Sequence, residues 1–200
     1  GNKNKLPEFH KKISQLKFLD PACGCGNFLV ITYRELRLLE LEILRAQYKN
    51  QYVTEIESII WLNVDMMYGI EYEEFPARIA EVAMWLIDHQ MNMLISNEFG
   101  QYFARLPLKK SAKIVHGDAL EVNWEDVVAK NQLSYIIGNP PFIGSKIMSQ
   151  FQRNQIIKEF DNSKGCGVLD YVSGWYLKAA KYIQNTKIKT AFVSTNSIVQ

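Results

Sequence analysis

The chain has 200 residues, of which 48% are hydrophobic and 22% are charged, enough apolar residues to bury the core of one globular domain. Its formal net charge of +2 is too small to mark a dedicated nucleic-acid-binding domain, which is usually far more basic. No stretch approaches the ~20 apolar residues that a membrane-spanning helix needs, and the first residues contain no signal-peptide core. Composition therefore predicts a soluble, cytoplasmic protein without a membrane partner.

The first half of the chain alternates between strand-like and helix-like patterns. Residues 1–17 carry several lysines and are expected to form a linker or N-terminal extension. An apolar strand is expected at 17–20, and a helix with a periodic apolar face runs from 27 to about 49. A second strand is expected at 66–71. The second helix is expected at 76–91, where a proline opens a segment with a broad apolar face.

The second half continues the alternation. Strands are expected at 112–117, 133–138 and 190–195, with a helix at 172–184. Residues 142–167 contain three glycines and many polar side chains, which indicates a long mobile loop with room for one helical turn. Strands that alternate with helices predict an α/β fold with a doubly wound, mostly parallel sheet. The last strand runs to the chain end without a cap or polar tail, so we expect a C-terminally truncated fragment of a longer protein.

The three cysteines are Cys23, Cys25 and Cys166. Their number is odd, and the Cys-x-Cys pair lacks the spacing and the histidine partners of a zinc site. The three histidines also show no ligand spacing. We therefore expect reduced thiols and no bound metal.

Polar side chains stand where four of the expected strands end. Asp20 ends the first strand in "FLDPACGCGNFL", Glu71 ends the second, Asp118 follows the third and Asn139 follows the fourth. Open parallel sheets bind ligands outside the carboxyl ends of their strands, so these side chains should share one rim. A carboxylate after the second strand commonly holds ribose hydroxyls, and a glycine loop lets a ligand approach the backbone. This pattern predicts a nucleoside site.

The glycine loop differs from a dinucleotide-binding fingerprint. It lacks the third glycine of that fingerprint, and Glu71 lies about fifty residues after Asp20 instead of about twenty. A nucleoside without a pyrophosphate therefore fits the pattern better than a dinucleotide does.

The turn after the fourth strand reads Asn139-Pro140-Pro141-Phe142. Each proline ring fixes its own φ angle and removes a backbone donor, so the Asn139 side-chain oxygen and the Pro140 carbonyl are preset acceptors. Two acceptors suit one NH2 group, and Phe142 offers an aromatic face on which a planar base can stack. The turn therefore predicts a site for an amino group on a flat ring.

The segments "DPACGCGNF", "GIE", "GDAL", "NPPF" and "DYVSGWYL" occur in this order. In this order they resemble the gamma-class N6-adenine DNA methyltransferases, which use S-adenosylmethionine. The sequence around these segments is similar to the methyltransferase segment of single-chain (type IIG/IIL) restriction-modification enzymes. The resemblance covers residues 18–200 and implies a catalytic domain with the Rossmann-like fold of S-adenosylmethionine-dependent methyltransferases.

The resemblance also implies roles for individual residues. Glu71 would take the ribose hydroxyls of the cofactor, Asp118 would accept from its adenine amine, and Ala119 and Tyr72 would lie against its adenine ring. Asn139 and Pro140 would hold the N6 amine of the target adenine, and Phe142 would stack on that base beside Pro141. The cofactor loop and its neighbours would be Phe18, Asp20, Pro21, Ala22, Cys23, Gly24, Gly26 and Asn27.

The sequence departs from the family pattern at Cys25, where a serine or threonine is more common. No nuclease motif or recognition domain is visible, so the resemblance implies that double-stranded DNA is bound through a recognition domain absent from this fragment. It also leaves room for a nuclease domain in the full-length chain. Two alternatives stay open: a methyltransferase that acts on protein glutamine or RNA, and a catalytically inactive binding fragment.

Overall fold

A computed structural model describes residues 5–48, 55–100 and 111–195 of the chain. Its strands are β1 (Phe18–Asp20), β2 (Met67–Glu71), β3 (Lys113–His116), β4 (Tyr135–Gly138) and β5 (Lys189–Phe192). Its α-helices are α1 (Leu6–Ser14), α2 (Asn27–Gln47), α3 (Ile56–Ile59), α4 (Glu74–Phe99), α5 (Trp124–Val127), α6 (Gln150–Glu159) and α7 (Ser173–Ile183). Two short 3-10 helices are η2 (Val64–Met66) and η3 (Cys166–Val168). Within these ranges no helix is long and apolar enough to cross a bilayer.

The five strands form one sheet in the order β3-β2-β1-β4-β5, and every pair is parallel. In the central strand, Leu19 lies opposite Tyr68 of β2 and Ile136 of β4. The predicted doubly wound, mostly parallel α/β fold is thus confirmed. The strand order reverses between β1 and β4, and open α/β sheets bind ligands at such a reversal.

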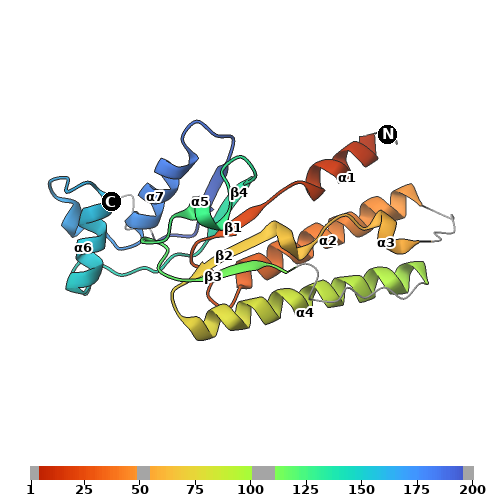
Figure 1. Ribbon diagram of the computed structural model, residues 1–200, viewed down its shortest axis with the longest axis horizontal. Coiled ribbons are helices and arrows are strands. Elements are labelled where there is room, and N and C mark those ends of the chain that lie inside the picture. Colours follow the sequence, from red (N-terminus) through yellow and green to blue (C-terminus); the bar gives the residue numbers. More distant parts are fainter. Residues whose placement is uncertain (1–4, 49–54, 101–110, 196–200) are drawn as a thin grey trace.

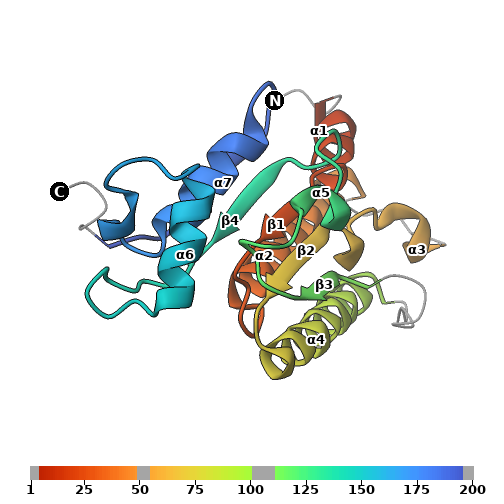
Figure 2. The ribbon, with the colours of Figure 1, turned by 60° about the vertical axis from the view of Figure 1, so that its left-hand side comes forward.

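Helices cover both faces of the sheet (Figures 1 and 2). On one face Phe18 packs in a core cluster with Tyr33 of α2 and Met84 of α4. On the other face Leu19 belongs to a second cluster with Trp175 of α7. Adjacent strand residues point to opposite faces, so burial of both faces explains why the central strand is apolar up to its last residue.

Helix α4 is longer than the sequence pattern predicts. The expected helix covers 76–91, whereas α4 continues to Phe99 and ends at Gly100, whose φ of +64° is the left-handed conformation that glycine adopts easily after a helix. Helix α2 ends at Gln47, and the expected end near Lys49 lies outside the described residues. The far ends of these two helices pack with α3 in a third, smaller core cluster.

The segment expected as a linker contains a helix. Leu6–Ser14 form α1, which begins with Pro7 in its first turn and buries His10 and Ile13 against α2. Residues 1–4 of the expected linker lie outside the described residues. The lysines at 11 and 12 are exposed in the last turn of α1, where positive charge is favourable.

The segment expected as a loop also contains a longer helix than predicted. Ten residues form α6, and the Ser149 hydroxyl accepts from the Gln152 backbone while the Gln152 side chain accepts from the Ser149 backbone. This capping box explains where the helix begins. Arg153 then ties the segment together by donating to the carbonyls of Ser145, at 2.7 Å, and Gly167.

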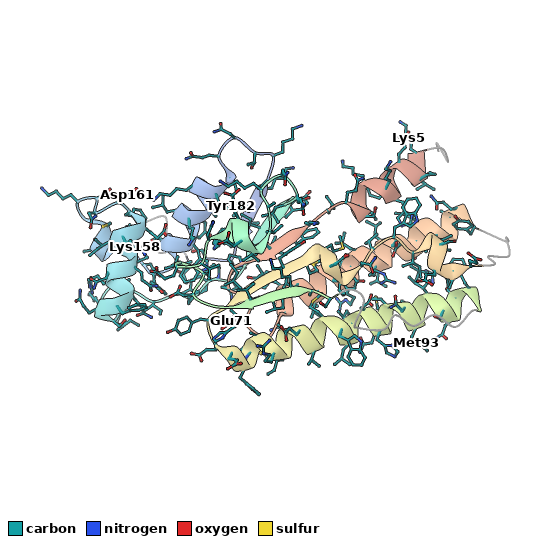
Figure 3. The ribbon with its side chains drawn as sticks, viewed as in Figure 1. Lys5, Glu71, Met93, Lys158, Asp161 and Tyr182 are labelled. Carbon is teal, nitrogen blue, oxygen red and sulfur yellow. The ribbon has the colours of Figure 1, made fainter. Side chains whose placement is uncertain are left out.

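The carboxyl ends of the strands point toward α6 and α7 (Figure 1). Figure 3 labels Glu71 at the end of β2 and Lys158 on α6, both on the side of the molecule away from Lys5. The fold therefore brings the polar strand ends and the 139–172 segment to the same edge of the sheet.

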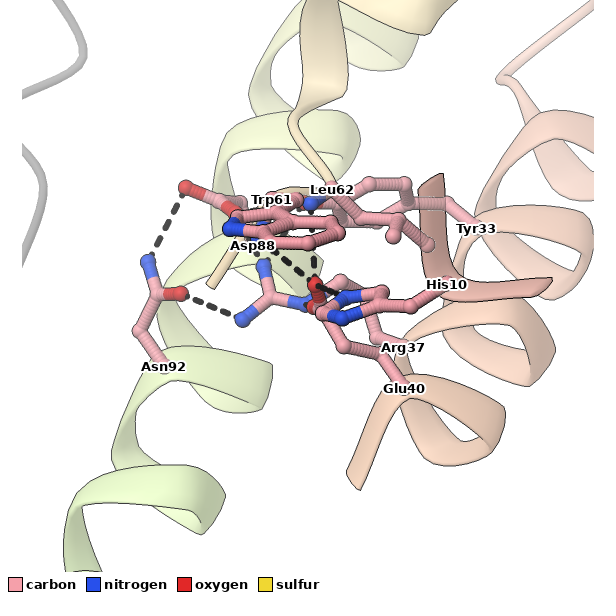
Figure 4. Close-up of polar contacts among 8 residues, drawn as sticks. All are labelled: His10, Tyr33, Arg37, Glu40, Trp61, Leu62, Asp88 and Asn92. Carbon is pink, nitrogen blue, oxygen red and sulfur yellow. Dashed lines mark hydrogen bonds and ion pairs between the residues drawn. The ribbon is translucent and has the colours of Figure 1, made fainter. Parts of the chain in front are cut away.

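A buried polar cluster joins α1, α2 and α4 at the opposite end of the molecule (Figure 4). It consists of His10, Tyr33, Arg37, Glu40, Asp88 and Asn92, and all its polar or charged members are at most 5% exposed. Glu40 Oε1 lies 2.8 Å from His10 Nε2 and accepts from the backbone amides of Trp61 and Leu62. Arg37 lies 3.1 Å from Glu40 Oε2 and 2.9 Å from Asp88. Buried charges need such partners, so this cluster fixes α1 and the segment before β2 onto α2.

Candidate active site

A cavity of about 530 Å³ lies at the carboxyl ends of β1, β2, β3 and β4. Nine of its lining residues were singled out from the sequence: Pro21, Ala22, Gly24, Glu71, Tyr72, Asp118, Ala119, Asn139 and Pro141. Seven were not named as site residues: Glu73, Ile143, Ser149, Phe151, Gln152, Tyr171 and Trp175, the last two of which lie in the quoted segment "DYVSGWYL". The four strand ends therefore share one rim, as their positions in a parallel sheet predict.

Backbone hydrogen bonds hold the loop after β1 beneath this cavity. The Cys23 amide donates to the Ile70 carbonyl at 3.0 Å, and the Gly26 amide donates to the Cys23 carbonyl at 2.8 Å. Gly26 has a φ of +87° and packs so close to Ala80 of α4 that a Cβ would lie 3.2 Å from the Ala80 methyl group. Glycine is thus required here both for the turn and for the packing of α2 on α4.

Asp20 lies under the loop and is only 1% exposed. Its Oδ1 accepts from the Ala22 amide at 3.0 Å, and a Cβ on Gly138 of β4 would overlap the same oxygen. Burial raises the pKa of Asp20 to about 7, outweighing the Ala22 hydrogen bond, which lowers it. Asp20 therefore shapes the loop from below, and it is not among the residues that line the cavity.

The raised pKa of Asp20 predicts a pH-dependent stability. Between about pH 4 and pH 7 the folded chain holds a proton that an unfolded chain, with a carboxyl pKa of 3.8, releases. Stability should therefore fall as the pH rises through this window, by up to about 1.4 kcal/mol per pH unit. Asp20→Asn should flatten this slope, as measured by urea unfolding at several pH values. Asp126→Asn, at an exposed carboxyl, should leave the slope as it is; equal slopes in wild type and Asp20→Asn would contradict the raised pKa.

Glu71 connects two turns at the rim. Its Oε2 accepts from the Gly24 amide at 2.8 Å and its Oε1 accepts from the Glu73 amide at 2.9 Å. These backbone donors fix the plane of the carboxylate at the cavity wall. Tyr72, which follows, is 60% exposed and lines the same wall.

Asp118 is held in a similar way after β3. Its Oδ1 accepts from the Leu120 amide at 2.9 Å, and its Oδ2 accepts from the Gln155 side chain of α6 at 2.7 Å. Ala119 beside it is buried and lines the cavity floor. An ionised carboxylate has about four acceptor positions, so each Asp118 oxygen keeps one for a ligand.

The residues of the turn after β4 differ in whether they face the cavity. Asn139 and Pro141 are exposed and line the cavity, whereas Pro140 is buried. Phe142 is 37% exposed and lies outside the lining, as the Ile143 amide turns inward to donate to Asp170 at 3.3 Å. The asparagine therefore faces the cavity, while the phenylalanine is left at the surface beside it.

The other residues of the expected cofactor loop pack in the core or begin α2 and do not line the cavity. Phe18 is buried and stacks on Tyr135 at 5.2 Å between ring centres. Cys23 is buried, and a Cβ on Gly69 would touch its sulfur at 2.7 Å. Asn27 is the exposed first residue of α2. The structure does not bring these side chains, or Gly26, to the cavity lining.

The far wall of the cavity comes from the segment around α6 and the start of α7. Trp175 donates to the Pro21 carbonyl at 3.0 Å, which joins α7 to the β1 loop, and its ring meets Tyr171 edge to face at 5.2 Å. The motif "DYVSGWYL" was one sequence signal for this wall. The capping box Ser149-x-x-Gln152 was a second available signal, for a helix that borders the site.

The described lining contains three carboxylates, at Glu71, Glu73 and Asp118, and no lysine, arginine or histidine. Such a wall accepts hydrogen bonds from hydroxyl and amino groups and favours positive charge. It repels phosphate groups, which need cationic or backbone donors. The electrostatics therefore suit a ligand that is rich in donors and carries no phosphate.

The family model for the DNA-methyltransferase domain of MmeI matches residues 1–200. The chain belongs to the MmeI DNA-methyltransferase domain family. DNA methyltransferase A of Bacillus subtilis (strain 168) is 37% identical to this MmeI-family domain over 199 residues, which are 98% of this chain and 22% of that protein.

Solved structures agree with this assignment. The Type IIL restriction-modification enzyme MmeI, solved in complex with DNA, matches with a TM-score of 0.95 at 57% identity, over 100% of this chain and 27% of that chain. The DrdV–DNA complex shares the fold, with a TM-score of 0.51 at 20% identity over 92% of this chain and 18% of that one. This MmeI-family domain thus spans 22% and 27% of the length of the B. subtilis protein and of MmeI.

Proposed function

We propose that this domain transfers a methyl group from S-adenosylmethionine to N6 of adenine in DNA, as part of a longer restriction-modification enzyme. Family membership supports DNA methylation, and the MmeI relative was solved bound to DNA. The observation that carries the finer proposal is the cavity rim, on which Glu71, Asp118 and Asn139 present acceptors from three successive strand ends.

The residues at the rim fit S-adenosylmethionine. Its ribose hydroxyls, adenine amine and α-amino group are donors, and its sulfonium is positive, which matches a wall with three carboxylates and no described cation. A cavity of about 530 Å³ is also of the size that holds such ligands. Glu71 would hold the ribose, Asp118 the adenine amine, and the Gly24 turn would lie beside the methionine part. When bound, the cofactor supplies a methyl group activated by the positive sulfur.

Asn139 and Pro140 would act on the target adenine. The N6 lone pair is delocalised into the ring, which makes the amine a poor nucleophile. By accepting both amine hydrogens, the Asn139 side-chain oxygen and the Pro140 carbonyl would localise this lone pair and aim it. The rigid Pro140-Pro141 backbone keeps the two acceptors in place before the base arrives, so little reorganisation is needed during the reaction.

The target base must leave the duplex to reach this turn, at a cost of a few kcal/mol. Phe142, exposed next to Asn139, offers a stacking surface for the extruded base. Double-stranded DNA is thus the proposed partner. A recognition domain elsewhere in the longer enzyme would bind the duplex sequence specifically, and a nuclease domain would belong to the same chain.

A methyltransferase acting on protein glutamine or RNA would use the same acceptor pair. Membership of a DNA-methyltransferase family favours the DNA substrate. The intact turn from Asn139 to Phe142 argues against an inactive binding module. Mass analysis of nucleosides after incubation of the full-length protein with labelled cofactor and DNA tests the product directly: N6-methyladenine is expected, and N4-methylcytosine or no product would overturn the proposal.

Glu71→Ala should weaken the binding of S-adenosylmethionine by about 10- to 100-fold, because hydrogen bonds to a charged group contribute about 1.5–3 kcal/mol. Titration calorimetry on the full-length protein measures this change. Glu74→Ala is the matched control, since Glu74 is exposed in the first turn of α4 and lies 3.7 Å from Arg78. NAD should not bind, because its phosphates would meet carboxylates. Unchanged affinity in Glu71→Ala would place the ribose elsewhere.

A further inference from the structure

Helix α6 lines one side of the cavity and contacts Asp118, although its sequence shows little helical amphipathicity. Only Gln155 and Ile156 of α6 are buried, and Gln155 is 4% exposed. A buried glutamine amide requires hydrogen-bond partners for its donor and its acceptor. The groups that bind the Gln155 amide lie in the turn after β3 and its surroundings.

The Gln155 amide has both partners. Its nitrogen donates to Asp118 Oδ2 at 2.7 Å, and its oxygen accepts from the Tyr171 hydroxyl at 2.6 Å. Burial, followed by the nearby Asp118 charge, raises the pKa of the Tyr171 hydroxyl well above its usual range. A carboxylate only accepts, so the Gln155 amide nitrogen must face Asp118 and the Gln155 oxygen then faces Tyr171. The Tyr171 hydroxyl keeps its proton and donates it to this oxygen.

This order of donors and acceptors leaves Asp118 with a defined set of free acceptor positions. The Leu120 amide takes one position on Oδ1 and Gln155 takes one on Oδ2, so the carboxylate cannot rotate without breaking a hydrogen bond. The remaining positions accept hydrogen bonds only. A ligand group at this point must donate, as an exocyclic amine does and a carbonyl oxygen does not.

We propose that Gln155, oriented by Tyr171, is a positioning residue that locks the Asp118 carboxylate and thereby makes the cofactor site selective for adenine over a 6-oxopurine. The proposal rests on the proposed function, in which Asp118 holds the adenine of S-adenosylmethionine.

The hydrogen bond between Gln155 and Asp118 also joins the segment that follows the Asn139 turn to the turn after β3. Gln155 and Tyr171 belong to the segment between the Asn139 turn and α7, and the Tyr171 amide donates to the Ile143 carbonyl at 3.0 Å. Asp118 belongs to the cofactor side. The ion pair of Lys158 with Glu121, at 2.6 Å, also joins α6 to this turn but is exposed, and exposed pairs contribute little. The buried Gln155 contact is therefore the one that sets the geometry.

The test compares two ligands on the full-length protein by titration calorimetry. One is S-adenosylhomocysteine, and the other is S-inosylhomocysteine, in which a carbonyl oxygen replaces the 6-amino group. Wild type should prefer the adenine compound by about 100-fold, since a site built for a donor rejects an analogue that lacks it. Gln155→Leu should weaken the adenine compound about tenfold, the loss of one hydrogen bond to a charged group, and change the inosine compound by less than about twofold.

Two further variants make the result decisive. Tyr171→Phe keeps the ring against Trp175 but removes the hydrogen bond that holds the Gln155 oxygen, so Gln155 is held less firmly against Asp118 and selectivity should fall about threefold even if Gln155→Leu does not fold. Gln150→Leu is the matched control, because Gln150 lies on the exposed face of α6 and donates to Asn154; its selectivity should equal that of wild type.

Asp118→Ala separates this proposal from the proposed function. If Asp118→Ala loses selectivity while Gln155→Leu and Tyr171→Phe keep it, the positioning role is overturned. An equal loss of affinity for both ligands in Gln155→Leu also overturns it, since that loss indicates a packing role alone. If Asp118→Ala keeps wild-type selectivity, the adenine does not bind at Asp118 and the proposed function itself is wrong at this point.

Discussion

Asn139→Ala in the full-length enzyme should lower the turnover of methyl transfer by about 100- to 1,000-fold, because removing a preorganised acceptor from a reacting centre commonly raises the barrier by about 2.7–4 kcal/mol. Asn139 is exposed at the cavity, next to two prolines that hold its backbone, so the truncated side chain leaves no packing defect. Affinity for S-adenosylmethionine should stay within a few-fold, since its proposed ribose and adenine contacts lie on Glu71 and Asp118. Single-turnover transfer of labelled methyl groups measures the first quantity, and calorimetry measures the second.

Asn131→Ala is the matched control for this experiment. Asn131 is an exposed asparagine in the turn before β4, at the opposite end of the same strand. It should leave both turnover and cofactor affinity unchanged. Near-normal turnover in Asn139→Ala would show that the turn after β4 does not hold the reacting amine, and a parallel loss of cofactor affinity would show that Asn139 belongs to the cofactor site instead.

The site could be predicted from the sequence to the extent that topology determines it. In a parallel sheet the carboxyl ends of all strands lie on the same edge. Once the strands were predicted, this placed Asp20, Glu71, Asp118 and Asn139 close together. The pattern does not tell which of these side chains faces the cavity. Asp20 and Phe142 were expected at the ligand, yet Asp20 lies beneath the loop and Phe142 beside the lining. The difference comes from side-chain direction, which depends on packing against Gly138 and Asp170.

Two helices that the sequence pattern did not predict, α6 and α1, are held by polar contacts with distant parts of the chain. Helix α6 buries only two of its ten residues, one of them a glutamine, so it has no apolar periodicity to detect. Helix α1 buries His10 and Ile13, and the reason for the buried histidine is Glu40, thirty residues away on α2. Contacts such as Gln155 with Asp118 and His10 with Glu40 join polar residues across the fold. Local hydrophobic patterns carry no information about such pairs.

Glu40→Leu should lower the free energy of unfolding by about 3–5 kcal/mol, the usual effect of removing one partner from a buried ion pair. Glu40 is fully buried and serves His10, Arg37 and the backbone amides of Trp61 and Leu62. Leucine fills much of the space but accepts no hydrogen bonds, so Arg37 keeps only Asp88 as a carboxylate partner and the backbone amides of Trp61 and Leu62 lose their acceptor. The shift of the urea midpoint at unchanged slope measures the loss.

Glu42→Leu provides the comparison within the same helix. Glu42 is exposed and lies 2.5 Å from Arg45, so its removal should shift the midpoint little. The double variant Arg37→Met with Glu40→Leu tests how strongly the two residues are coupled, because Arg37 is the cation that faces Glu40 Oε2. Its loss of stability should be smaller than the sum of the two single losses, since residues in one network are not additive. Strict additivity would mean that Arg37 and Glu40 stabilise the fold independently of each other.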